Sequence, residues 1–152
     1  MEKDKTIEVL NTLITINNDR IEGYETASKE TEELDLKALF GQFILTSQKC
    51  KKELDVEVNM LGGEAAEGTT VSGKFFRAWM DVKAALTGKD RKTILNSCES
   101  GEDEALDTYE EALENNFEHL SAEHQSMIMH QKSLLKADHD HVKALRDAFV
   151  DV

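Results

Sequence analysis

The sequence contains no proline and only two cysteines, Cys50 and Cys98, among its 152 residues. Because proline breaks helix interiors, its absence allows long uninterrupted helices along the whole chain. Two cysteines cannot form a disulfide framework, and in a reducing compartment both would be free thiols. β-Branched residues are scattered, whereas Leu, Ala, Glu and Lys are abundant, so the composition predicts an all-α protein. The length suits one domain with a single core, covering residues 1–152.

Long apolar runs and common catalytic motifs are also missing. The first ten residues, MEKDKTIEVL, lack the apolar core of a signal peptide, and no apolar run is long enough to cross a bilayer. We therefore expect a cytoplasmic protein without a membrane partner. The chain shows no dinucleotide fingerprint and no Ser/His/Asp arrangement, and its segment GGEAAEG lacks the lysine and spacing of a P-loop.

Positive charge is scarce relative to negative charge. The chain has 18 basic and 31 acidic residues, and its formal net charge is −13. The acidic residues are spread over every segment instead of forming one tail. Such a field repels nucleic acid and anionic membranes, so we expect neither as a partner. It can draw cations toward the protein, although it usually marks a solvated surface.

Hydrophobic residues recur at three- and four-residue steps in four segments, which predicts four long helices. These are residues 5–28, 35–61, 90–115 and 121–150. We expect Ile21 and Tyr24 to face inward on the first helix and Tyr109 on the third. The glycine pair at 62–63 should end the second helix, and Ser121 is the expected N-cap of the fourth.

The connections between the helices predict the topology. The first two and the last two helices are joined by short polar segments, so each pair should form an antiparallel hairpin. Residues 62–73, which hold half of the glycines, form a loop that covers ~40 Å when stretched. That is comparable to the length of a helix of about 25 residues. The chain can therefore return to the other end, which is the connectivity of a ferritin-like four-helix bundle. Its crossover carries an expected short helix, FFRAWMDVKAAL, over residues 75–86.

Near its midpoint, each expected helix interrupts its apolar stripe with polar or thiol side chains. Burying such groups without partners would be unfavourable, so they must bond one another, hold water or bind a ligand. The residues of this predicted polar core layer are Asn17, Ser47, Cys50, Cys98, Glu102, Asp138 and His141.

Two interpretations of the layer remain open. Asp138 and His141 have the i, i+3 spacing that brings a carboxylate and an imidazole to one helix face, and Glu102 adds a third ligand. These three residues could hold a single divalent metal such as Fe, Mn or Zn, whereas the first two helices lack the ligands for a bridged pair of irons. The interpretation that we favour is a hydrogen-bonded or ion-paired cluster that fixes the helix register.

Other side chains with potential chemistry receive plainer interpretations. His139 falls toward the edge of the apolar stripe, and the remaining histidines outside the layer are expected at exposed positions. The two cysteines could meet as a redox pair, but no neighbouring basic residue argues for an activated thiolate, so we expect buried, inert thiols.

Four blocks of the sequence resemble a known family. The blocks LNTLITINNDRIEGYETA, GKFFRAWMDVKAALTGKD, CESGEDEALDTYEEAL and KADHDHVKALRD are similar to the bacterial ferritin-like four-helix-bundle proteins of unknown function, distant relatives of bacterioferritins. The resemblance covers about residues 5–147. It implies that Asn17 stands at the position of a metal-binding Glu and that Ser47 and Cys50 stand at a Glu-x-x-His. It also implies that Glu102 or its neighbour Gly101, together with Asp138 and His141, falls at the remaining ligand positions.

We therefore expect a non-catalytic, cytoplasmic bundle with a structural, interaction or stress-associated role and a degenerate polar layer in place of a di-iron site. The alternative is a metal-binding protein or oxidoreductase with an unusual site at Glu102, Asp138 and His141. By analogy with ferritin-like bundles, a homodimer or a further protein partner is expected.

Overall fold

The computed structural model describes residues 2–68 and 91–148, and over these ranges the chain forms four long helices. They are α1 (Glu2–Glu30), α2 (Leu34–Met60), α4 (Arg91–Asn116) and α5 (Ala122–Asp147), with the short 3-10 helix η1 (Phe117–His119) before α5. The predicted all-α four-helix bundle is confirmed. The short crossover helix expected over residues 75–86 lies outside the described residues.

Local signals end the helices where the sequence indicates. Ser121 has extended backbone angles, and its hydroxyl accepts a hydrogen bond from the backbone N–H of His124 at 3.1 Å, so it is the N-cap of α5. Helix α2 ends at Met60, and Gly62 has a φ of 84°, a conformation that other residues rarely adopt. The Gly62 N–H donates to the carbonyl of Asn59 at 3.0 Å, which closes the helix end.

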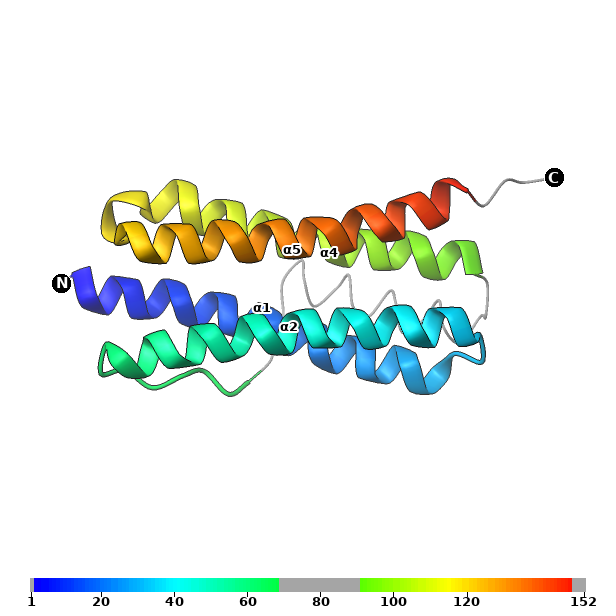
Figure 1. The fold of residues 1–152 in the computed structure, drawn as a ribbon, viewed down its shortest axis with the longest axis horizontal. Helices are drawn as coiled ribbons and strands as arrows, with labels where there is room; N and C mark the ends of the chain where they lie inside the picture. Colours follow the sequence, from blue (N-terminus) through cyan, green and yellow to red (C-terminus); the bar gives the residue numbers. More distant parts are fainter. Residues whose placement is uncertain (1, 69–90, 149–152) are drawn as a thin grey trace.

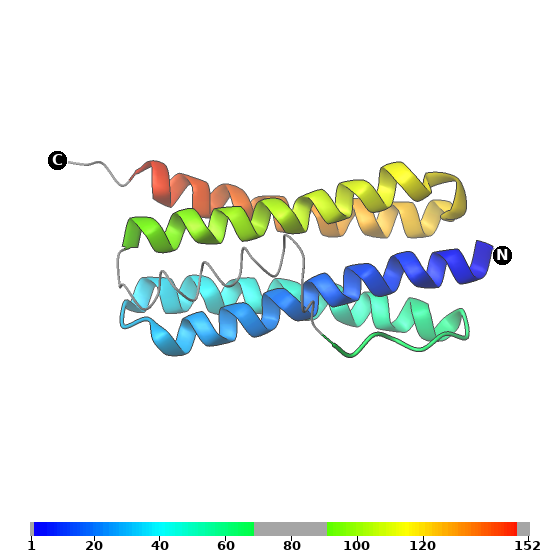
Figure 2. The same ribbon diagram turned by 180° about the vertical axis from the view of Figure 1, so that it is seen from behind.

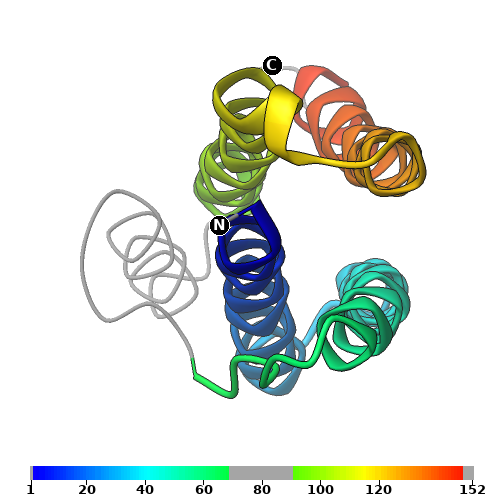
Figure 3. The ribbon, with the colours of Figure 1, turned by 90° about the vertical axis from the view of Figure 1, so that its left-hand side faces the viewer.

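The helices pair as two antiparallel hairpins, α1 with α2 and α4 with α5 (Figure 1). Helices α2 and α4 run in the same direction, as the sequence predicts for a chain that crosses the length of the bundle between them (Figure 1). From behind, α1 and α4 lie side by side (Figure 2), and the end view places α2 beneath α5 (Figure 3). All four helices therefore border one shared interior.

Apolar side chains from every helix fill this interior, and burying each large one stabilises the fold by roughly 1.5–3 kcal/mol. The fully buried ones include Leu10, Ile14, Phe40, Phe43, Leu54, Leu95, Ile128 and Leu135. Tyr24 stacks on Phe40 with ring centres 5.4 Å apart and meets Phe43 edge-on at 5.1 Å. None of the helices in the described ranges has an apolar stretch of the length and purity that a membrane crossing requires.

Polar contacts join the two hairpins at both ends of the bundle. At one end, the Thr6 hydroxyl donates to the backbone carbonyl of His119 at 2.8 Å. At the other end, Arg91 at the start of α4 pairs with Asp35 at 2.7 Å and with Glu33 at 3.1 Å. The ends are therefore aligned by hydrogen bonds and ion pairs, and the middle is aligned by the buried groups described next.

Candidate functional site

A fully buried arginine lies in the middle of the bundle. Arg20 on α1 binds Glu102 on α4 through two bonds, Nε to Oε2 at 3.0 Å and Nη2 to Oε1 at 2.7 Å. Such bidentate pairing matches the planar guanidinium to a carboxylate. Nη2 also reaches Asp138 Oδ2 on α5 at 3.2 Å, and Nη1 donates to Ser47 Oγ on α2 at 2.6 Å. One side chain thus binds all three other helices. We call Arg20, Glu102 and Asp138 the Arg20 cluster.

Aromatic side chains complete the surroundings of the Arg20 cluster. The Tyr24 hydroxyl donates to Glu102 Oε1 at 2.5 Å. The guanidinium carbon of Arg20 lies 5.5 Å from the ring centre of Tyr24 and 6.0 Å from that of Phe43, within the range of cation–π attraction. The buried charges are therefore surrounded by hydrogen bonds and aromatic rings.

The charges in the Arg20 cluster are unequal, because one guanidinium faces two carboxyl groups. Burial opposes the charge of Arg20, but Glu102, Tyr24 and Asp138 together hold the pKa of Arg20 above its ordinary value. Burial raises the pKa of Asp138, Arg20 opposes that rise, and Glu102 adds to it. Burial and Glu102 also raise the pKa of Tyr24, so its hydroxyl remains a donor. Arg20 is thus a permanent cation, and Asp138 is the carboxyl group that releases its proton less readily than usual.

A second buried chain of hydrogen bonds lies one turn away along α1. Asn17 Nδ2 donates to the Tyr109 hydroxyl at 2.8 Å, and that hydroxyl donates to Gln131 Oε1 at 2.8 Å. Gln131 Nε2 donates to the Cys50 carbonyl at 3.2 Å and to Glu53 Oε1 at 3.0 Å. Burial raises the pKa of Tyr109, which keeps the bridging hydroxyl protonated. This chain again connects all four helices and helps to fix their register.

The structure places most of the predicted polar core layer in the interior. The buried members are Asn17, Ser47, Cys50, Cys98, Glu102 and Asp138. His141 is instead exposed, with its ring centre 6.5 Å from that of Phe43. The buried stripe of α5 passes through Leu135, Asp138 and Val142, and these steps leave His141 at its edge. Glu102 and Asp138 are therefore brought together around Arg20, without His141.

Arg20, the residue that holds the site together, is not in the predicted polar core layer. Arg20 lies three residues after Asn17 and four before Tyr24, so it shares their inward face. We expected Ile21 on that face, but Ile21 is only partly buried, whereas Arg20 is fully buried. The detectable signal was the charge of the layer, because two buried carboxyl groups require a cation. Gln131, a buried residue of α5, was not predicted to lie in the core either. The signal for it was a polar side chain at the inward spacing of that helix.

Both cysteines are free and buried. Burial raises the pKa of Cys50 to about 11. Burial, with a contribution from Glu102, also raises the pKa of Cys98. A thiol must lose its proton to act as a nucleophile or to exchange disulfides, so neither side chain is activated near neutral pH.

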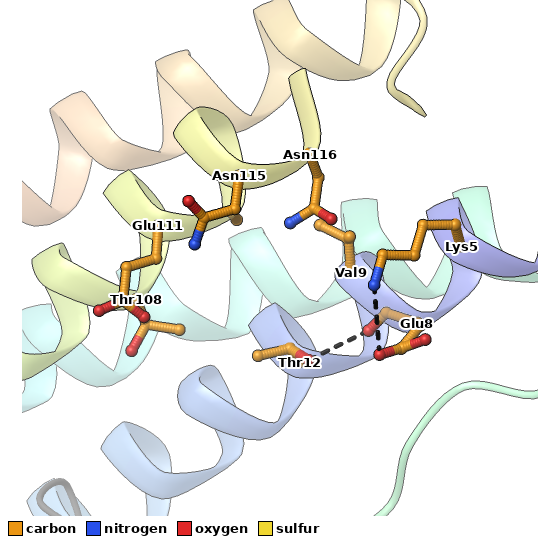
Figure 4. A pocket seen from close by; sticks show the side chains of 9 residues that line it. Lys5, Glu8, Val9, Thr12, Thr108, Glu111, Asn115 and Asn116 are labelled. Carbon is orange, nitrogen blue, oxygen red and sulfur yellow. Dashed lines mark hydrogen bonds and ion pairs between the residues drawn. The ribbon is translucent and has the colours of Figure 1, made fainter. Parts of the chain in front are cut away.

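A surface pocket of about 160 Å³ lies between α1 and α4 (Figure 4). Its lining consists of Lys5, Glu8, Val9, Thr12, Thr108, Glu111, Ala112, Asn115 and Asn116. Lys5 pairs with Glu8 across 3.7 Å. Among the described residues, the pocket lining has no histidine or cysteine and no member of the polar core layer, so they supply neither a nucleophile with its base nor a mixed metal-ligand set.

Part of the Arg20 cluster lies in a segment that a known family model matches. The family model described as Domain of unknown function (DUF2383) matches residues 5–115. The matched segment contains Arg20, Ser47 and Glu102, whereas Asp138 follows it. No curated protein was found to match the chain.

Replacing Arg20 should lower the free energy of unfolding more than replacing a surface arginine does. Arg20→Met keeps the aliphatic length but leaves two buried carboxyl groups without their cation, so we expect a loss of about 3–5 kcal/mol in the free energy of unfolding. Arg20→Lys keeps the charge but loses the two-bond pairing with Glu102, so its loss should be smaller. Urea unfolding followed by circular dichroism measures both variants.

Arg91→Met is the matched control, because Arg91 also pairs with two carboxylates but keeps a quarter of its side chain exposed. Exposed pairs contribute little, and we expect a change below about 1 kcal/mol. Equal losses for Arg20→Met and Arg91→Met would show that Arg20 is not a buried ion-pair partner.

The pH dependence of stability should report on Asp138. Burial raises the pKa of Asp138 above the ordinary value of an aspartate in the folded protein, so as pH falls from neutrality the folded state takes up this proton before the unfolded chain does. Protonation of Asp138 therefore adds stability as pH falls toward that ordinary value, and rising pH removes the contribution. Asp138→Asn cannot titrate and should lack it. Urea unfolding at neutral pH and at about pH 4 should show that the native protein gains stability relative to Asp138→Asn as pH falls. A difference in unfolding free energy that stays the same at both pH values would show that the pKa of Asp138 is not raised.

Proposed function

The chain belongs to the DUF2383 family, and we propose that it is a non-catalytic four-helix-bundle protein in which the Arg20 cluster occupies the place of a metal centre. The observation that carries this proposal is the position of the Arg20 guanidinium, which bonds to both carboxyl groups that a core metal would need. A permanent cation compensates these carboxyl groups without exchange and without redox chemistry. The interior is then a structural element.

We further propose that the scaffold is ferritin-like and that its di-iron site has been lost. The parallel course of α2 and α4 supports the first part (Figure 1). The second part is supported by Ser47, which accepts a hydrogen bond from Arg20, and by Asn17, which bonds to Tyr109. Both residues stand where the resemblance implies metal ligands, and both are engaged in hydrogen bonds within the core. The free thiols suit a reducing compartment, so the proposal includes a cytoplasmic location, which cell fractionation would test.

The alternative is a metal-binding protein or oxidoreductase with a site at Glu102, Asp138 and His141. This site would require Arg20 to release two buried carboxyl groups and the exposed His141 to turn inward. Breaking such a buried pair is strongly unfavourable unless the metal compensates it fully. The metal measurements described below decide between the two functions.

The purified protein should show no iron chemistry in its core. We expect protein prepared without affinity tags or chelators to oxidise added Fe²⁺ in air no faster than buffer does. Elemental analysis should find the same metal content in the native protein and in Glu102→Gln. Saturable oxidation of Fe²⁺ that disappears in Glu102→Gln, or metal lost from both Glu102→Gln and His141→Ala, would instead establish the alternative function.

Because the interior has only a structural role in this proposal, we expect the protein to bind its partner through its surface. A groove of about 520 Å³ between α2 and α5 is lined by Val56, Met127, His130 and three charged residues of α2. Val56 is 50% exposed, and Met60, one turn farther on α2, is 76% exposed. Exposed apolar side chains beside a groove are typical of contact surfaces, and methionine adapts readily to a partner. We propose a second copy of this chain as that partner.

Salt should strengthen this self-association, because two copies that each carry a formal charge of −13 repel each other. Analytical ultracentrifugation should show the mass of two chains at high ionic strength, and the combined variant Val56→Glu, Met60→Glu should sediment as one chain. Leu34→Glu is the control, since Leu34 is 81% exposed at the other end of α2. A single-chain mass for the native protein at every salt and protein concentration would rule out the homodimer.

A further inference from the structure

Two carboxylates and an imidazole converge between α4 and α5, separate from the Arg20 cluster. Glu99 and Asp103 are four residues apart on α4, so they share one face of that helix, and His139 faces them from α5. One ligand atom from each residue lies within 4.8 Å of the other two. The three residues thus offer one nitrogen and two oxygen ligand atoms within 4.8 Å of one another.

The convergence point is half enclosed. The side chains of His139 and Glu99 are 14% and 15% exposed, whereas that of Asp103 is 54% exposed. Two of the buried atoms, His139 Nε2 and Glu99 Oε2, make no hydrogen bond of acceptable geometry within the described part of the chain. The nearest charged groups are Asp103 Oδ1, at 2.6 Å from His139 Nε2, and Arg146 Nη1, at 2.5 Å from Glu99 Oε2. These two ligand atoms therefore lie close to possible partners without directional hydrogen bonds, and the exposed side chain of Asp103 leaves a route from solvent.

The imidazole is held in an orientation suited to metal binding. His139 Nδ1 lies 3.1 Å from Asp140 Oδ1, and Lys136 Nζ holds the other oxygen of Asp140 at 3.0 Å. Asp140 Oδ1 can therefore accept the ring proton from His139 Nδ1. With the ring proton on Nδ1, the lone pair of Nε2 points toward Asp103 and Glu99. A carboxylate behind the imidazole is the usual support of a metal-binding histidine.

We propose that Glu99, Asp103 and His139 bind a divalent transition-metal ion, with Zn²⁺ as the ion to which the site is best suited. Imidazole together with carboxylates favours zinc and its neighbours over the all-oxygen ions Mg²⁺ and Ca²⁺. Zinc takes such ligands at about 2.0–2.2 Å, so side-chain rotations that bring the three atoms about 1 Å closer to a common centre would suffice. Two carboxylates balance the charge of the ion, and a fourth coordination position remains for water. The bound ion ties α4 to α5.

Arg146 is the competitor of the metal ion. Its guanidinium lies against Glu99, but it also pairs with Asp147 at 2.9 Å in the last turn of α5. It can therefore keep one carboxylate partner while it releases Glu99. Removing His139 should therefore weaken metal binding, whereas removing the charge of Arg146 should strengthen it.

Isothermal titration of the full chain with ZnCl₂ tests the proposal. We expect one ion per chain, an affinity at least about tenfold lower in His139→Ala, and a tighter affinity in Arg146→Gln. His141→Ala is the matched control, since it removes an exposed imidazole two residues along the same helix and should leave the affinity unchanged. The melting temperature of the native protein should rise with zinc concentration, and this rise should disappear in His139→Ala.

Two results would overturn the proposal. One is the absence of zinc binding by the native protein, and the other is equal binding by the native protein and His139→Ala. Glu102→Gln separates this site from the core, because zinc binding at Glu99, Asp103 and His139 should survive that change. Zinc binding lost in Glu102→Gln but kept in His139→Ala would place the ion in the core, and it would contradict both this proposal and the proposed function.

Discussion

Arg20 carries a charge that is strongly unfavourable in the interior unless it is fully paired, because breaking a buried ion pair typically destabilises a protein by about 3–5 kcal/mol. Pairing is achieved when α4 brings Glu102 and α5 brings Asp138 to the same guanidinium. Since Ser47 also bonds to it, the rotation and axial position of three helices relative to α1 are constrained at one point. The apolar core supplies most of the stabilisation, and we propose that the Arg20 cluster selects this arrangement among those with similar apolar burial.

The same buried charge bears on function. Carboxyl groups in a helical bundle need a cation, and metal-binding bundles obtain it from an exchangeable ion. Here the cation is covalently part of α1, so it cannot exchange, accept electrons or activate water. Buried thiols with raised pKa values add no reactive group in the interior. In the proposed function, recognition therefore belongs to the surface of the bundle, where the proposed zinc ligands and the groove between α2 and α5 are found.

Core and surface sites are built from neighbouring residues on the same two helices. On α4, Glu102 binds Arg20 and the next residue, Asp103, faces the proposed metal site. On α5, Asp138 binds Arg20 and the next residue, His139, completes that metal site. Consecutive helical residues project about 100° apart, so each helix can serve the interior and an outer face within one turn. A rotation of either helix would disturb both sites together.

Periodicity, the Gly62 stop and the Ser121 cap were sufficient to predict the four helices and their pairing, since these signals are local and depend on the backbone and nearest residues alone. The sequence also showed that polar groups must occur at mid-height. It did not show that Arg20 turns inward in preference to Ile21, or that His139, rather than His141, meets the carboxylates of α4. These alternatives lie one or two positions apart on a helix, and only the packing of all four helices determines which of them reaches a partner from a distant segment. Sequence alone thus determined where the helices form, and the tertiary structure decided which charges are paired, because the electrostatic energy of a buried group depends on partners more than 80 residues away.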